Sequence, residues 1–217
     1  MGLTMMKAIL RRGFISGGLA LGLAVVGLGL TSLPAAAANP AENFVQDNIH
    51  KGLDLLNNRA ASADQRRTQF ATFLLGLTDM KRIADFTLGQ YRRSASPADL
   101  AAFDAAFQTY AVAVYQSYFA RYAGQTLKVT GSQARAADDF IVATQLIDPN
   151  DHSGQAPLEV DFRVRTDTGK PVVIDFAVSG IWLALEERDQ FTSFLGQNGG
   201  NIALLNSHLN DLAKQYK

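Results

Sequence analysis

Apolar side chains recur at helical spacing through the first half of the chain. Two helix starts also carry capping residues. Ser62 with Gln65 three positions on has the spacing of a capping box, and Ser96 precedes Pro97, a proline suited to the first helical position. The spacing therefore predicts helices over residues 42–57, 62–77 and 97–123, with a short segment over 79–88 before the last of them.

After Gly124 the apolar positions alternate, so that their period falls from about 3.6 to 2. In the clearest stretch, 158–165, apolar and charged residues alternate one by one. One apolar and one charged face are typical of an antiparallel sheet that is covered on one side. The fourth strand should place Val172, Ile174, Phe176 and Val178 on one face. The first predicted strand begins at 127, and the others lie at 140–147, 158–165 and 171–179, with the longest connection over 148–154.

Two further helices, over 186–195 and 202–216, close the chain. The order of elements predicts an α+β fold: a twisted four-stranded antiparallel sheet with helices packed on its apolar face. We expect one domain over residues 39–217, helical over 41–123, sheet over 125–180 and helical over 184–216. A chain of this length can bury a sizeable core.

Residues 1–38 have the three zones of a cleavable export signal: a basic start, an apolar stretch over 17–33 and an alanine run over 35–38. We expect cleavage after Ala38 and a mature protein in the periplasm. The pair Arg11-Arg12 resembles a twin-arginine signal in part, so that both this route and general secretion stay open. An uncleaved membrane anchor is the alternative, since an apolar stretch of about 18 residues can span a bilayer.

Charge and composition exclude several classes of protein. Without the signal, which holds three of the 20 basic residues, 17 basic residues face 20 acidic ones, a net charge of −3. This balance argues against a nucleic-acid partner, which favours a basic surface. The chain has no cysteine, which excludes disulfides and thiolate metal sites.

The residue types that carry catalysis do not form a recognisable set. His50, His152 and His208 lack the spacing of metal ligands, and neighbouring carboxylates at 138–139 and 186–187 should point apart as solvated or capping groups. We therefore expect no enzymatic activity, no metal and no cofactor. Large apolar side chains are abundant instead. They either fill the core or line a cavity for an apolar ligand.

Three segments resemble the Mla-type periplasmic phospholipid-binding proteins (MlaC), also called the toluene-tolerance auxiliary family. Residues 83–93 are similar to the Leu-Gly-x-Tyr/Trp-Arg segment before a long helix, and 118–124 to a Tyr-x-x-x-Tyr-x-Gly exit into the first strand. Residues 175–183, followed by Arg-x-x-Phe at 188–191, resemble an Asp-x-x-Val-x-Gly-hydroxyl-x-Leu segment. Trp182 departs from this pattern, because the family usually has a small hydroxyl residue there.

The resemblance implies a carrier that holds the acyl chains of a phospholipid between sheet and helices. Because a carrier that hands over its cargo is most simply a monomer, we expect a monomer. It would pass lipid between an outer-membrane lipoprotein complex and an inner-membrane ABC-type transporter. One alternative is a hopanoid or other polycyclic lipid, because a sister branch of the family is associated with hopanoid production. Another is a periplasmic adaptor or chaperone without lipid. The candidate lipid-binding residues are Phe103, Phe107, Tyr110, Val114, Val142, Val160, Phe162, Ile174, Phe176, Val178, Ile181, Trp182, Phe191 and Phe194.

Overall fold

The computed structural model describes residues 39–119, 122–167 and 169–216. The expected export signal, residues 1–38, lies outside the described residues. In chain order the helices and strands are α2 (Pro40–Asn57), α3 (Ala63–Leu77), α4 (Met80–Thr87), the 3₁₀-helix η1 (Gly89–Arg93), α5 (Pro97–Phe119), β1 (Thr126–Ala136), β2 (Asp139–Ile147), β3 (Glu159–Arg165), β4 (Val172–Val178), β5 (Ile181–Trp182), α6 (Leu183–Gln197) and α7 (Ile202–Gln215).

The predicted helix starts are confirmed by their caps. The Ser62 hydroxyl accepts a hydrogen bond from the Gln65 backbone N–H, and the Gln65 side chain accepts one from the Ser62 N–H, which completes the capping box. Helix α5 starts at Pro97, and the Ser96 hydroxyl accepts from the backbone N–H of Asp99. These bonds satisfy N–H groups that have no partner within the helix.

The sheet has five antiparallel strands in the order β1-β2-β3-β4-β5, so the prediction of four strands is wrong by one. The added strand, β5, pairs with the end of β4 through Val178 and Ile181. Ser179 and Gly180 between them both have positive φ, 49° and 79°. Positive φ at both central residues defines the two-residue hairpin turn that matches strand twist. This turn folds Ile181 and Trp182 back onto β4 before α6 begins.

A register shift in β4 changes which residues share its apolar face. Phe162 of β3 lies opposite Phe176, but Val164 lies opposite Val173, since the pairing shifts between Arg163 and Val164. Directly opposed residues project to the same face of a sheet. Val173 therefore joins Phe176 and Val178 on that face. The prediction that Val172 and Ile174 also lie on it is wrong.

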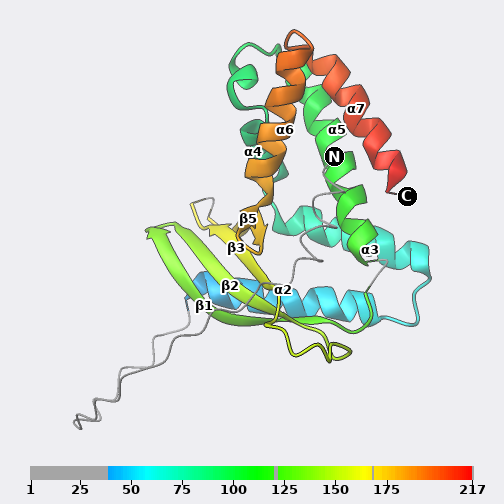
Figure 1. The fold of residues 1–217 in the computed structure, drawn as a ribbon, viewed down its shortest axis with the longest axis vertical. Coiled ribbons are helices and arrows are strands. Elements are labelled where there is room, and N and C mark those ends of the chain that lie inside the picture. Colours follow the sequence, from blue (N-terminus) through cyan, green and yellow to red (C-terminus); the bar gives the residue numbers. More distant parts are fainter. Residues whose placement is uncertain (1–38, 120–121, 168, 217) are drawn as a thin grey trace. The chain divides into compact units, whose positions relative to one another are not determined.

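The apolar side chains form two separate clusters. One lies between α2 and the sheet and joins Ala41 and Val45 to Val142 and Val164. The other takes all its buried residues from α4, α5, α6 and α7, except Leu88, which directly follows α4. Within it, α5 and α7 lie side by side (Figure 1). The prediction that all helices gather on the apolar face of the sheet is thus not met by α5, α6 and α7, whose buried residues form this separate cluster.

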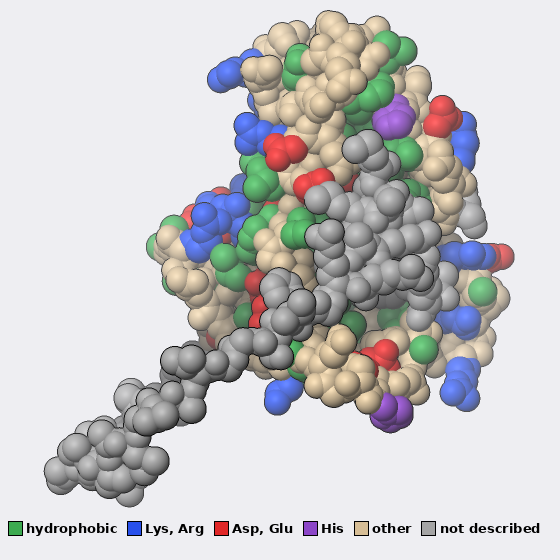
Figure 2. All heavy atoms as spheres, in the orientation of Figure 1, with side chains coloured by type: hydrophobic (Ala, Val, Ile, Leu, Met, Phe, Trp, Pro, Cys, Tyr) green, Lys and Arg blue, Asp and Glu red, His purple; other side chains and the backbone are tan. Residues whose placement is uncertain are grey.

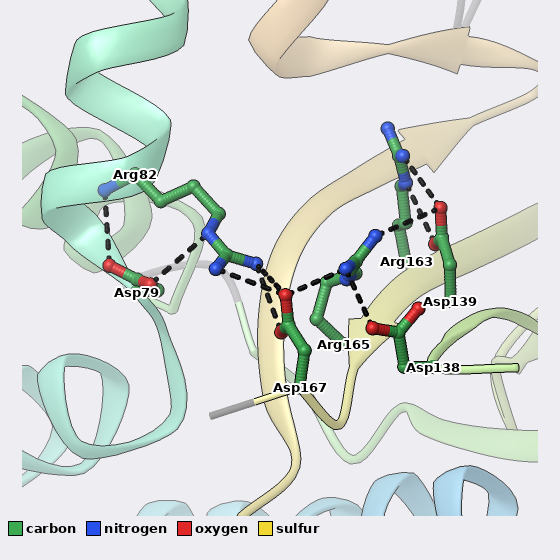
Figure 3. A network of polar contacts seen from close by, with 7 residues as sticks. All are labelled: Asp79, Arg82, Asp138, Asp139, Arg163, Arg165 and Asp167. Atoms are coloured by element: carbon green, nitrogen blue, oxygen red, sulfur yellow. Dashed lines mark hydrogen bonds and ion pairs between the residues drawn. The ribbon is translucent and has the colours of Figure 1, made fainter. Parts of the chain in front are cut away.

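Carboxylates and guanidinium groups connect α4 to the sheet (Figure 3). Asp79 caps α4 by accepting from the backbone N–H of Arg82, and Arg82 Nη1 lies 3.2 Å from Asp167 Oδ1 in the turn between β3 and β4. Hydrogen bonds from Arg165 and Arg82 lower the pKa of Asp167 to about 2. The backbone N–H of Asp79 also donates to the carbonyl of Val173, so the chain is attached to β4 where α3 ends and α4 begins.

The turn between β1 and β2 joins the same network. Asp139 accepts two hydrogen bonds from Arg163, at 3.0 and 2.7 Å, and this pairing lowers the pKa of Asp139. Arg165 bridges Asp138 and Asp167, at 3.0 and 2.6 Å. Asp139 is buried, which corrects the expectation that both carboxylates at 138–139 are solvated. Elsewhere, on the face drawn in Figure 2, charged side chains of both signs are interspersed.

Candidate functional site

An apolar pocket of about 250 Å³ lies between α2, α3 and the sheet. Its walls are formed mainly by aliphatic and aromatic side chains, and none of its lining residues is charged. The lining residues are Phe44, Val45, Asn48, Ile49, Gly52, Leu53, Leu56, Phe70, Phe73, Leu74, Leu77, Tyr122, Gln125, Thr126, Leu127, Leu146, Phe162 and Val173.

The two helical walls follow from the sequence spacing. On α2, Val45, Ile49, Gly52 and Leu56 recur at intervals of three and four residues and so lie on one face of the helix. On α3 the residues from Phe70 to Leu77 do the same. The sheet closes the pocket with side chains such as Phe162 and Val173, the latter placed there by the register shift in β4.

Polar groups gather at the end of the pocket where α2 finishes and β1 begins. Asn57 Nδ2 donates to the Tyr122 hydroxyl at 3.2 Å, and Gln125 Nε2 donates to Asp148 Oδ2 at 3.0 Å. The bond from Gln125 lowers the pKa of Asp148. These hydrogen bonds therefore satisfy polar side chains at the edge of the pocket. An apolar site with few polar groups at its edge is suited to a ligand with a long apolar part.

Of the predicted lipid-binding residues, Phe162 alone lies among those lining this pocket. Phe103, Phe107, Tyr110 and Phe191 are buried together in the helical cluster, where the Phe103 and Phe191 rings meet edge to face at 6.1 Å. Val114 and Phe194 pack against the same cluster. The expectation that this stripe of α5 faces the sheet is not met by the geometry, because α6 and α7 cover it.

The remaining predicted residues lie on or beside the sheet. Val142 is fully buried under α2. Val160 and Val178 oppose each other on the apolar face, and Phe176 lies between Phe162 and Tyr115, with ring centroids 6.5 and 5.4 Å away. Ile174 is the bulged residue of β4, and Ile181 and Trp182 form β5. Contact of these residues with a lipid stays a prediction.

Sequence reasoning missed the pocket walls on α2 and α3. The signal was present in the regular apolar rows of both helices, from Val45 to Leu56 and from Phe70 to Leu77. An apolar row in a sequence, however, does not show whether its side chains pack in the core or line a pocket. The pocket was predicted at α5 because its aromatic stripe is denser. In the structure these aromatic side chains pack against α6 and α7.

The carboxyl group of Glu187 on α6 contacts the helical cluster through Tyr110. The Tyr110 hydroxyl donates to Glu187 Oε1 at 2.9 Å, while Glu187 Oε2 is shut off from solvent without a hydrogen-bond partner. Burial raises the pKa of Glu187 to about 7, and the charge of Glu186 adds to the rise. The expectation that both residues at 186–187 are solvated or capping groups is therefore wrong for Glu187.

Within the described part of the chain, no group of three or more His, Asp or Glu side chains could hold a metal ion. The three histidines are apart: His50 lies beside Gln46 on α2, His152 is in the loop after β2, and His208 stacks on Phe194 with ring centroids 4.9 Å apart. None of the helices described from residue 39 onwards has the length and apolarity to cross a membrane.

The fold and the pocket define an α+β protein with an apolar site between its sheet and its N-terminal helices. Sequence comparison agrees with this class: the MlaC protein family matches residues 46–211, and the chain belongs to that family. A solved structure of a phospholipid-binding protein from Ralstonia solanacearum, in complex with a phospholipid, has the same fold. It superposes with a TM-score of 0.70 at 21% identity, over 81% of this chain and 98% of the other.

Proposed function

We propose that this chain is a lipid carrier, not an enzyme, and that its pocket holds the acyl chains of a phospholipid. The observation that carries the proposal is the uncharged, largely apolar lining of the 250 Å³ pocket between α2, α3 and the sheet. Membership of the MlaC family and the phospholipid bound to the Ralstonia solanacearum protein of the same fold support it.

Physical chemistry explains the need for such a pocket. Each methylene group that leaves water contributes about 0.8 kcal/mol, so a lipid with two acyl chains has a negligible free concentration in water. A protein that covers the chains can carry the lipid through an aqueous compartment while the head group stays hydrated. The polar side chains at the end of α2 and the start of β1 suit a neighbouring head group.

The proposal extends to the compartment and the partners. The pattern of residues 1–38 supports export, and the family supports transfer between an outer-membrane lipoprotein complex and an inner-membrane ABC-type transporter. We expect the protein recovered from the periplasmic fraction to begin at Asn39 or within two residues of it. N-terminal sequencing measures this. A membrane-bound protein that still carries residues 1–38 would contradict export by cleavage.

Lipid content tests the carrier function directly. Protein purified from cells should carry about one diacyl lipid per chain, identified by mass spectrometry of an organic extract. Removing the lipid should lower the melting temperature, because a ligand that binds only the folded state stabilises it. A polycyclic lipid in the extract would point to the hopanoid alternative. A lipid-free protein that neither takes up added lipid nor changes its melting temperature would favour an adaptor.

A further inference from the structure

A glycine in the middle of α2 forms part of the pocket wall. Gly52 is buried and lies at position 13 of the 18-residue helix Pro40–Asn57. A Cβ atom on Gly52 would lie 3.3 Å from Cε1 and 3.7 Å from Cζ of Phe73 on α3. The first distance is tighter than an ordinary van der Waals contact. A side chain at position 52 would therefore require the Phe73 ring to move by a few tenths of an ångström.

Neither the backbone nor helix stability accounts for glycine at this position. Gly52 is inside a regular α-helix and does not have the positive φ that favours glycine. Glycine in a helix interior is less stable than alanine. The space needed by the Phe73 ring is therefore the physical reason that the structure offers. Both residues line the pocket, so their contact also limits how far its two helical walls approach each other.

We propose that Gly52 and Phe73 together set the width of the pocket and thereby select lipids by the number of their chains. This inference rests on the proposed lipid-carrier function. Gly52 leaves α2 without a side chain at this point, and Phe73 supplies the facing wall from α3. A larger residue at position 52 narrows the pocket from one side, and a larger ring at position 73 narrows it from the other. A smaller residue at position 73 restores the room that a larger residue at 52 removes.

The test compares two lipids in four variants. Delipidated protein is incubated with vesicles of dioleoylphosphatidylglycerol or with oleoyl-lysophosphatidylcholine, re-isolated, and its bound lipid is counted by mass spectrometry. Gly52→Leu and Phe73→Trp should each lower loading of the two-chain lipid at least tenfold and loading of the one-chain lipid about twofold. Gly52→Leu combined with Phe73→Ala should recover at least half of the two-chain loading.

The chain provides a matched control in Gly76, a glycine within α3 that is exposed and has no atom within 4 Å of a Cβ built on it. Gly76→Ala should leave the loading of both lipids unchanged. If wild-type protein loads neither lipid, the carrier function itself fails. If the wild type loads both lipids, the narrowed variants decide, provided that circular dichroism shows them folded. The size-selecting role is overturned if these variants load the two-chain lipid as well as the wild type does, or if they lose both lipids to the same extent. If Gly52→Leu does not fold, Phe73→Trp and the double variant Gly52→Leu with Phe73→Ala are compared with the wild type instead, and the same two outcomes overturn the role.

Discussion

Replacing Phe103 with alanine should lower the free energy of unfolding of the lipid-free protein by about 3–5 kcal/mol, the usual cost of removing a buried aromatic ring. Phe103 has no exposed surface, and its ring lies 5.9 Å from Phe107 and 6.1 Å from Phe191 between centroids. The change therefore leaves a cavity that close packing with α6 and α7 cannot refill. Urea unfolding followed by circular dichroism measures the loss.

Lipid retention separates this core residue from a pocket residue. Phe103 does not line the pocket, so folded Phe103→Ala protein should retain lipid as the wild type does. Phe162→Ala is the comparison, because Phe162 lines the pocket and is only half-buried. It should cost the lipid-free protein much less stability and reduce lipid retention. The opposite pattern, lipid lost in Phe103→Ala at little cost in stability, would place the ligand in the helical cluster.

Replacing Glu187 with glutamine should stabilise the protein in alkaline solution by up to about 3 kcal/mol. The carboxyl has a pKa of about 7 in the folded protein against an ordinary value of 4.5, and each pKa unit corresponds to about 1.4 kcal/mol. Glutamine resembles the protonated acid and keeps the acceptor for the Tyr110 hydroxyl. The side chain then has no charge to bury.

The sign of the pH dependence follows from the raised pKa. The favourable contribution of protonated Glu187 is complete below pH 4.5, the pKa of the unfolded chain, and is lost as the pH rises through about 7. Wild type and Glu187→Gln should therefore have equal stability near pH 4.5 and differ most at pH 8. Asp189→Asn, which removes the charge of an exposed carboxylate on the same helix, is the control and should change stability little at either pH. If the wild type and Glu187→Gln are equally stable at pH 8, the raised pKa of the buried Glu187 carboxyl is contradicted.

Local signals in the sequence predicted most of the fold. The capping box at Ser62 and the Ser96-Pro97 start depend on residues within three positions of one another, and both are found as expected. The strand β5 was not predicted because the turn at Ser179 and Gly180 requires positive φ at a serine, which is uncommon outside glycine and asparagine. The bulge at Ile174 has no local signature, since it arises from pairing with β3.

The site was harder to predict than the fold for a related reason. Whether a buried apolar side chain contacts protein or ligand depends on how distant segments meet. Phe103 and Phe162 look equivalent in the sequence, yet α6 covers the first and the second lines the pocket. Glu187 follows Glu186 directly in the sequence. Only the tertiary structure shows that the carboxyl of Glu187 points toward the buried Tyr110.

The strand order has a consequence for how the pocket assembles. All four strand pairings join neighbours in the chain, so the meander consists of short-range hairpins, which form with little loss of loop entropy. The contacts between α2 and the sheet are of the opposite kind: Asn39, the N-cap of α2, donates to the hydroxyl of Ser132, 93 positions away. Because chains emerge N-terminus first, the apolar rows of α2 and α3 precede the sheet that they will cover. Until β1–β4 have formed, the sheet side of the pocket is missing, and the apolar rows of α2 and α3 lack the strands that cover them in the folded protein.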